Sequence, residues 1–535
     1  MFTGQLHPYQ VEAVETVIAD RALLVAYSMG TGKTVLTIAA LEELFGKGDI
    51  SCGVILVPAT VKWQWAKAIA AFTDTPTRTL KIRGTEITVP DESVCVVING
   101  KKEKRREQWR LAQTGQADYV IASYSAILHD WRDLCQVPAD ALVLDEAAAI
   151  KNFSSQTSQR VKKLTPPVRV ALTGTPVENR PEDVFSIMEW VDHTVLGRWD
   201  TFEKSFIVRN DWGVVVRYKN LHLLHDRLRA RMIRKSRTDP DVAPYLPTVA
   251  ETTRTVRLDA ATRTVYRRIQ KDLLDALADL SEAGSNFDLA AYYHGDDTGG
   301  EYTAQGRVMA RLLAARMLLD HPGLLMDSAV EFHQGNGRGS QYIADFLGTY
   351  QDAADLQATP KLHELGRNVD AILEDDPSAK IAVFTDFRRM LPYLTERLDR
   401  HGAIAQYHGG LNADQKAAVK ERFSSDPECH VFLSTNAGGV GLDLPEAQYL
   451  INYDLPYSGG ILAQRNSRHV RASSTHSCVF IVNLIAEDTV EERNLATLQL
   501  RSRVADAILD GTGNTVVPNT VDSLTAHLEK NFSPQ

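Results

Sequence analysis

Two regions of this 535-residue chain repeat one pattern, in which a short apolar run is followed by a segment with helical spacing. Parallel strands need a crossover connection that is usually a helix, so the pattern is typical of a parallel sheet covered by helices. The runs are ALLVAY, GVILVPA, ALVLDEA and VRVALTGTP in the first region, and KIAVFTDF, HVFLST, QYLINYD and CVFIVNLI in the second. We therefore predict an α/β protein with two lobes, each built on a mostly parallel sheet.

The expected boundaries lie where this pattern stops. We place the first lobe at residues 1–255 and the second at residues 359–510. Between them, the segments TRTVYRRIQKDLLDALADL and RVMARLLAARMLLD have helical spacing, which predicts a helical insertion over residues 256–358. Residues 511–535 form a tail that carries no motif.

The most specific motif, SMGTGKT at residues 28–34, lies between the first apolar run and the helical segment after it. A glycine-rich loop in this position lets backbone N–H groups approach phosphates, and the helix N-terminus favours negative charge. Lys33 is predicted to reach the β- and γ-phosphates of ATP, and Thr34 to ligate Mg²⁺. The other residues predicted to surround the phosphates are Met29, Gly30, Thr31 and Gly32.

An acidic pair, Asp145 and Glu146, directly follows the apolar run ALVL. An acidic pair after a strand is, by itself, more often the N-cap of a helix. With a phosphate-binding loop upstream, the pair indicates nucleotide hydrolysis instead. We expect Asp145 to hold Mg²⁺ and Glu146 to polarise the attacking water.

The second region contains QRNSRHVR, where three arginines are spaced by three residues and are expected to lie near one face of a helical turn. An isolated run of this kind is usually a solvated basic face. Because it follows a second α/β lobe, we predict that Arg465 and Arg468 are catalytic, as fingers on the γ-phosphate. The upstream Gly459 and Gly460 predict a flexible approach to this segment.

Further motifs run in a fixed order along almost the whole chain: HPYQ at residues 7–10, VPATVKWQW, ASYSAI, LTGTPVEN, DHPGLL and FLSTNAGGVGLDLPEA. Together with MGTGKT, they resemble the Swi/Snf-type ATPases of the superfamily two helicases, which are DNA translocases, and especially their compact bacterial or viral members. The resemblance implies two RecA-like lobes. It also implies that Gln10 contacts the adenine and that Gly441 belongs to the nucleotide site.

The same resemblance implies a path for nucleic acid. The contact residues that it implies are Pro58, Ser123, Thr173, Thr175, Ser434, Thr435, Gly438 and Gly439, with Arg231, Arg234 and Lys235 from a basic segment. The family's tryptophan lies on a helix, so we expect Trp63 and Trp65 to pack into the lobe and not to stack on a base. Ala148 stands where the family has a histidine that couples hydrolysis to movement, which predicts altered coupling.

The composition excludes several classes of protein. With 59 Lys and Arg against 68 Asp and Glu, the net charge is −9, so a polycation that binds nucleic acid by global attraction is excluded. The five cysteines form no C-x-x-C pair, which indicates a reducing compartment, and no apolar run is long enough to cross a membrane. We expect a cytoplasmic monomer.

These features predict a DNA-dependent ATPase that uses ATP and Mg²⁺ to move along double-stranded DNA, remodelling DNA or the proteins bound to it. One alternative is a helicase that separates strands of DNA or RNA. Another is a non-catalytic scaffold that binds nucleic acid, but such a chain would lack Lys33, Glu146 or the finger arginines, and all are present.

Overall fold

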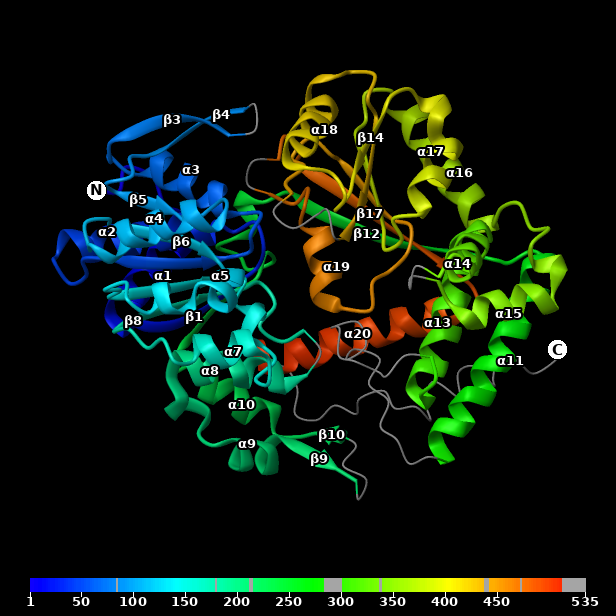
Figure 1. Cartoon of the computed structure of the whole chain (residues 1–535), viewed down its shortest axis with the longest axis horizontal. Helices are drawn as coiled ribbons and strands as arrows, with labels where there is room; N and C mark the ends of the chain where they lie inside the picture. The colour runs from blue at the N-terminus through cyan, green and yellow to red at the C-terminus, as the bar shows by residue number, and fades with distance from the viewer. Residues whose placement is uncertain are drawn as a thin grey trace.

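The computed structural model describes residues 1–82, 85–178, 180–210, 215–282, 301–335, 339–436, 442–471 and 474–511. Gly438, Gly439 and Gly441 of the predicted sites lie outside the described residues, as does the tail from residue 512 onward. The described residues form two lobes, each built on a parallel sheet, which confirms the predicted fold class (Figure 1).

The first lobe contains a seven-stranded sheet in the order β11-β1-β8-β7-β2-β6-β5, and every pairing is parallel. Apart from the edge strand β11, which is half-buried, its strands are buried on both faces, so they read in the sequence as mostly apolar runs. They are β1 (Ala22–Tyr27), β2 (Gly53–Val57), β5 (Cys95–Val97), β6 (Tyr119–Ser123), β7 (Ala141–Asp145), β8 (Val168–Leu172) and β11 (Met232–Lys235).

Helices cover both faces of this sheet, and a separate apolar core lies on each face. The helices are α1 (Pro8–Asp20), α2 (Lys33–Gly46), α3 (Lys62–Phe72), α4 (Lys102–Gln113), α5 (Tyr124–His129), α6 (Trp131–Leu134), α7 (Gln156–Val161), α8 (Pro181–Leu196), α9 (Trp199–Phe206) and α10 (Leu221–Leu228). Two antiparallel hairpins extend from the lobe: β3 (Thr77–Ile82) with β4 (Thr85–Pro90), and β9 (Ile207–Arg209) with β10 (Val215–Tyr218).

The second lobe contains a six-stranded parallel sheet in the order β12-β17-β16-β13-β15-β14. Its strands are β12 (Thr248–Val256), β13 (Ile381–Thr385), β14 (Ile404–Tyr407), β15 (Val431–Thr435), β16 (Tyr449–Asn452) and β17 (Cys478–Ala486). We had assigned residues up to 255 to the first lobe, but β12 pairs with β17 along its whole length. The strand is at the sheet edge and mostly exposed, so it lacks the apolar run that marks the buried strands.

The predicted insertion is helical and packs onto the second lobe. It contains α11 (Ala260–Glu282), α13 (Ala304–Asp320), α14 (Gly323–His333) and α15 (Gln341–Thr349), and the lobe's own helices are α16 (Pro360–Asp375), α17 (Met390–Leu398), α18 (Ala413–Ser425) and α19 (Gly459–Asn466). Leu273 and Leu318 of the insertion share one apolar core with Leu365 and Val383 of the lobe. The insertion therefore enlarges the second lobe.

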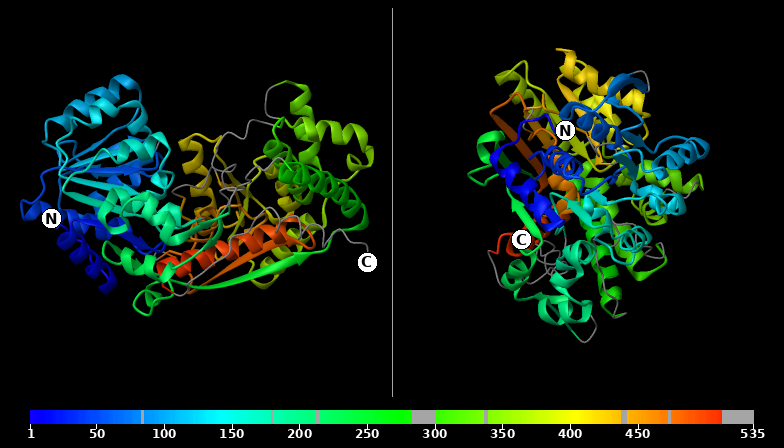
Figure 2. Two further views of the ribbon diagram at one scale, coloured as in Figure 1. Left: turned by 90° about the horizontal axis from the view of Figure 1, so that it is seen from below. Right: turned by 90° about the vertical axis from the view of Figure 1, so that its left-hand side faces the viewer.

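The last described helix, α20 (Val490–Leu509), connects the two lobes (Figure 2). It begins beside β17 and ends against α8 and α10, where Val504 and Ile508 join the core of the first lobe. Among the described residues, no helix combines the length and apolar character needed to span a bilayer.

Candidate ATP site and nucleic-acid motifs

The order of strands in the first sheet brings the predicted catalytic motifs together. In a parallel sheet, ligand sites form at the carboxyl ends of the strands. The phosphate-binding loop follows β1, Thr173 follows β8 and the pair Asp145 and Glu146 ends β7, and these three strands are neighbours with β8 in the middle. Residues separated by more than 100 positions therefore share one edge.

The phosphate-binding loop has the backbone that its glycines allow. Gly30 and Gly32 have φ values of 84° and 79°, in the left-handed region that favours glycine. Lys33 begins α2, and its Nζ donates hydrogen bonds to the carbonyl oxygens of Tyr27 (2.9 Å) and Ser28 (3.2 Å). Burial lowers the pKa of Lys33, an effect that the nearby Glu146 and Asp145 oppose. The half-buried ammonium would be stabilised by a negatively charged group in the loop.

The start of α1 holds this loop in place. Thr31 O accepts hydrogen bonds from Gln10 Nε2 (3.0 Å) and from the Tyr9 hydroxyl (3.1 Å). Gln10 Oε1 accepts a hydrogen bond from the backbone N–H of His7 (2.9 Å). Both ends of the Gln10 amide thus have backbone partners, and its contact with adenine stays a prediction.

Asp145 is held by a tryptophan that the sequence suggested only as a core residue. Trp65 is buried, as we expected, and its Nε1 donates a 2.7 Å hydrogen bond to Asp145 Oδ2. Asp145 Oδ1 accepts a hydrogen bond from the backbone N–H of Glu146 (3.0 Å). Burial raises the pKa of Asp145, while Trp65 and Lys33 oppose this shift. Trp65 therefore fixes the carboxylate that was predicted to hold Mg²⁺.

Glu146 has two features typical of a reactive group. Its φ of 52° places a non-glycine residue in the left-handed region, which is a strained conformation concentrated at functional sites. Its Oε2 is buried and has no hydrogen-bond partner among the described residues. Burial, and then the charge of Asp145, raise its pKa. An acceptor of this kind can take a proton from a water molecule.

Arginine side chains from the second lobe reach this site across the lobe interface. A Cβ on Gly30 would lie 2.5 Å from Val470 O and 3.6 Å from Arg471 Cδ. Burial, followed by the neighbouring charge of Arg471, lowers the pKa of Arg468 to about 10, and Glu146 opposes the shift. Arg471 therefore lies beside the phosphate-binding loop and Arg468 lies near Glu146, and Arg471 was not among our predicted catalytic residues.

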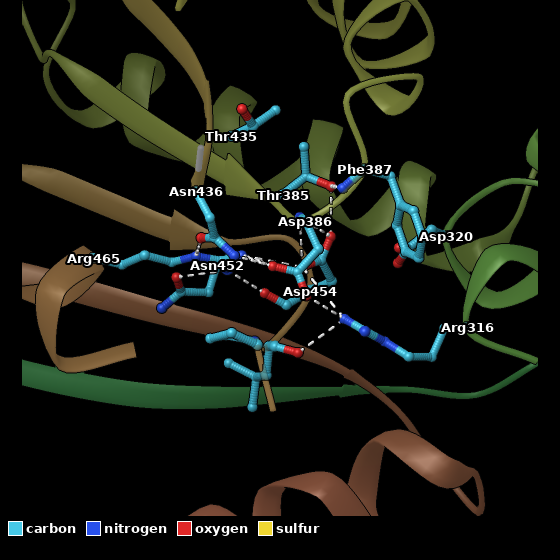
Figure 3. Close-up of polar contacts among 12 residues, drawn as sticks. Arg316, Asp320, Thr385, Asp386, Phe387, Thr435, Asn436, Asn452, Asp454 and Arg465 are labelled. Atoms are coloured by element: carbon cyan, nitrogen blue, oxygen red, sulfur yellow. Dashed lines mark hydrogen bonds and ion pairs between the residues drawn. The ribbon is translucent and has the colours of Figure 1, made fainter. Parts of the chain in front are cut away.

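Arg465 has a different environment. Helix α19 ends at Asn466, so the three arginines do not share one helical face as the spacing predicted. The Arg465 guanidinium is buried and donates to Asp386 Oδ1 (2.6 Å) and to Asp454 O (2.6 Å), both in the second lobe (Figure 3). The structure thus gives Arg465 a place inside its own lobe, in contrast to the predicted finger at the γ-phosphate.

The Asp386 carboxylate also binds an arginine from the insertion. Arg316 of α13 donates to Asp386 Oδ2 (2.7 Å) and to Leu455 O (3.1 Å), and Asn436 at the end of β15 also donates to Asp386 (Figure 3). The charges of Arg465 and Arg316 keep the pKa of Asp386 low in spite of its burial. We call Arg316, Asp386, Asp454 and Arg465 the Asp386 cluster, and it ties the insertion to α19.

Replacing Arg465 by alanine should destabilise the second lobe, because Asp454 and Asp386 would lose a buried partner. The loss is expected to be about 3–5 kcal/mol in the free energy of unfolding. Urea unfolding followed by circular dichroism would measure it. The matched control is Arg422→Ala, which removes an exposed pair with Asp426 in the same lobe and should cost less than about 1 kcal/mol. Equal stability of the two variants would contradict the buried role.

The residues predicted to contact nucleic acid have different surroundings in the structure. Pro58 follows β2 and Ser123 is the last residue of β6, so both lie at the same sheet edge as the ATP motifs, and Ser123 is buried there. Thr173, Ser434 and Thr435 are almost fully buried. The remaining member, Thr175, donates its backbone N–H to Thr173 Oγ1 (3.1 Å).

The basic segment at β11 does not form an open groove. Arg231 is paired with Asp192 and Asp20, Arg234 with Asp510, and Lys235 with Asp241 and Glu12. β11 is the edge strand beside β1, and acidic residues from α1 and from the end of α20 face it. The ion pairs occupy all three cations in this structure, and their contact with the phosphate backbone of DNA stays a prediction.

A model of the SNF2-related domain matches residues 9–311, and a model of the helicase conserved C-terminal domain matches residues 362–473. Putative ATP-dependent helicase/translocase YwqA of Bacillus subtilis is 25% identical over 518 residues, which cover 95% of this chain and 49% of that protein. The ISWI chromatin-remodeling complex ATPase ISW1 of Saccharomyces cerevisiae is 25% identical over 512 residues, 93% of this chain and 40% of that protein.

A solved structure shows the same fold. The helicase domain of Pyrococcus furiosus Hef has a TM-score of 0.54 and 16% identity, and the match covers 92% of this chain and 97% of that one. The chain spans about half the length, or less, of the two relatives named above. Because the SNF2-related model alone covers more than half of its residues, the chain belongs to the SNF2-related family, the Swi/Snf-type ATPases of helicase superfamily two.

Proposed function

We propose that this protein is a DNA-dependent ATPase that moves along double-stranded DNA and remodels DNA or the proteins bound to it. The observation that carries the proposal is the contact of the phosphate-binding loop of one lobe with the arginine segment of the other, where Ser467 Oγ donates to Met29 Sδ (3.1 Å) and Val470 O lies against Gly30. A site divided between two lobes is complete only when they close, so hydrolysis can be linked to movement of one lobe against the other.

The residues present fit ATP and Mg²⁺. Lys33 is a half-buried cation, and Gly30 and Gly32 adopt the backbone that allows N–H groups to approach phosphates. Asp145 and Thr34 would hold Mg²⁺, because hard cations prefer oxygen ligands and bind through few protein groups when phosphates are present. The metal would neutralise charge on the phosphates.

The residues of the ATP site then have separate roles in hydrolysis. Lys33 binds the phosphates, while Gln10 and Tyr9 keep the loop in shape through Thr31. The free Oε2 of Glu146 orients the attacking water and accepts its proton. Arg468 and Arg471 stabilise the charge that develops on the transferred phosphoryl group.

DNA would contact the carboxyl edges of both sheets. In the first lobe, Pro58 and Ser123 lie at the edge that also carries the ATP motifs. In the second lobe, the Arg388 guanidinium lies against Gly410 at the end of β14. Burial, and then the charges of Arg388 and Lys416, lower the pKa of the neighbouring His408. This basic cluster replaces the β11 segment as the candidate for phosphate contacts.

Double-stranded DNA should stimulate hydrolysis more than single-stranded DNA or RNA. Contacts to phosphates do not read bases, so stimulation should vary little with base composition. DNA affinity should fall by about 10³-fold or more between ~50 and ~200 mM salt if at least roughly six phosphates are contacted. Displacement of a third strand from a triplex would report translocation, and unwinding of a tailed duplex would report strand separation.

The outcomes of that comparison separate the alternatives. Third-strand displacement without unwinding supports the translocase. Efficient unwinding, or stronger stimulation by RNA, would show a helicase. Binding without any hydrolysis would show a scaffold. Arg388→Glu should weaken binding to all duplexes equally, whereas Arg231→Glu, in the ion-paired β11 segment, serves as the charge-matched control.

A further inference from the structure

Glu178 lies where the two lobes meet, two residues after the segment Thr173–Pro176. Its carboxylate is buried and forms an ion pair with Lys151 of the same lobe. From the second lobe, the Ser458 hydroxyl donates a hydrogen bond to Glu178 Oε2 (3.3 Å). Burial raises the pKa of Glu178, and Lys151 opposes this shift. The Glu178 carboxylate thus connects Lys151, in the segment that follows Asp145 and Glu146, to Ser458, in the segment that precedes the arginines of the second lobe.

The contact is made at the N-terminus of α19. Ser458 is the N-cap of this helix, and its Oγ accepts a hydrogen bond from the backbone N–H of Ile461 (3.4 Å). The N-terminus of a helix carries partial positive charge, so a carboxylate is stabilised there. Glu178 therefore fits this end of α19 both by hydrogen bonding and by charge.

The two glycines that follow Ser458 differ sharply in their surroundings. A Cβ on Gly460 would lie 2.5 Å from Glu178 Cδ, a distance that real Cβ atoms essentially never show. A Cβ on Gly459 would lie 3.6 Å from Glu178 O, which is an ordinary contact. The sequence predicted a flexible approach at these glycines. The structure shows instead that Gly460 is needed for close packing against Glu178.

The position of α19 determines the position of the arginines behind it. The helix ends two residues before Arg468. In the same segment, Ser467 Oγ donates to Met29 Sδ of the phosphate-binding loop (3.1 Å), and Val470 O lies against Gly30. A shift at the start of α19 would therefore be carried to the groups that face the phosphates.

We propose that Glu178 is a positioning residue that docks the N-terminus of α19 onto the first lobe when the lobes close, and that Gly460 is the glycine this docking requires. The proposal rests on the proposed ATP hydrolysis. Glu178 does not touch the phosphates in this scheme. It acts through α19 by placing Arg468.

The test compares two neighbouring glycines. Gly460→Ala should lower kcat for duplex-stimulated hydrolysis by about 100-fold, because a displacement of about 1 Å at a catalytic group has an effect of that size. KM for ATP should change little, since Lys33 and its loop are untouched. Gly459→Ala is the matched control and should stay within about 2-fold of the wild type. Wild-type kcat in Gly460→Ala would overturn the proposal.

A second variant tests whether the effect passes through Glu178. Glu178→Ala removes the docking carboxylate and should lower kcat, but it also makes room for a methyl group at position 460. The double variant Glu178→Ala/Gly460→Ala should therefore be as fast as Glu178→Ala alone. A double variant clearly slower than Glu178→Ala would overturn the proposal, because the methyl group would then act elsewhere.

Dyes placed on opposite lobes give a readout that does not need hydrolysis. With a non-hydrolysable ATP analogue and duplex DNA, energy transfer should report closure in the wild type and in Gly459→Ala, and reduced closure in Gly460→Ala and Glu178→Ala. If the wild type hydrolyses no ATP with any nucleic acid, the proposed function fails while the dye distances still test docking. If the wild type hydrolyses ATP and Gly460→Ala closes normally, only the proposed role of Glu178 is wrong.

Discussion

Lys33→Ala and Glu146→Gln should each lower ATP hydrolysis by about 10³-fold or more, for different physical reasons. Lys33 is a half-buried ammonium whose hydrogen bonds go to the carbonyl oxygens of Tyr27 and Ser28, so its removal takes away the positive charge that is predicted to bind the phosphates. Lys33→Ala should therefore weaken ATP binding as well. Steady-state hydrolysis and titration with a fluorescent nucleotide would measure the two effects separately.

Glu146→Gln should still bind ATP. The substitution keeps the size of the side chain and replaces the unpaired carboxylate oxygen, which is the proton acceptor, by an amide. Lys47→Ala and Glu43→Gln are matched controls, because this exposed pair lies at the far end of α2 and away from the site. Near-normal hydrolysis by either active-site variant would show that the chemistry takes place elsewhere.

Arg468→Ala should lower kcat by about 10³-fold or more, the effect expected when a finger that stabilises transition-state charge is lost. The residue is buried at the lobe interface beside Glu146, and its guanidinium donates to Leu442 O (3.0 Å). DNA affinity should remain near that of the wild type, because this side chain faces the ATP motifs. Hydrolysis at saturating ATP and DNA, together with DNA binding, would check both expectations.

Arg465→Ala is the informative partner of this experiment, because the two arginines are three residues apart and of the same type. In Arg465→Ala the main loss should be stability of the second lobe, through the Asp386 cluster. If Arg465→Ala folds normally and fails to hydrolyse, while Arg468→Ala remains active, the finger is Arg465 and the sequence-based prediction was right for that residue.

The sequence determined the features that depend on neighbouring residues or on burial of whole strands. A phosphate-binding loop needs only a few consecutive residues, and two glycines with positive φ followed by a lysine at a helix start occur as SMGTGKT predicted. The central strands are buried on both faces, so their apolar runs could be recognised and both parallel sheets predicted. The family was also predicted from the sequence, because its motifs occur in a fixed order along the chain.

Only the tertiary structure decided how residues far apart in the sequence are paired. A spacing of three residues cannot show which arginine faces ATP. Helix α19 ends between Arg465 and Arg468, so the two side chains have different partners: Arg465 binds Asp386 of its own lobe, and Arg468 lies near Glu146 of the other lobe. The cations of β11 looked available until Asp192, Asp510 and Glu12 were placed beside them. Ion pairs of this kind join segments that are far apart in the sequence, by 276 positions for Arg234 and Asp510, and local sequence patterns carry no signal for them.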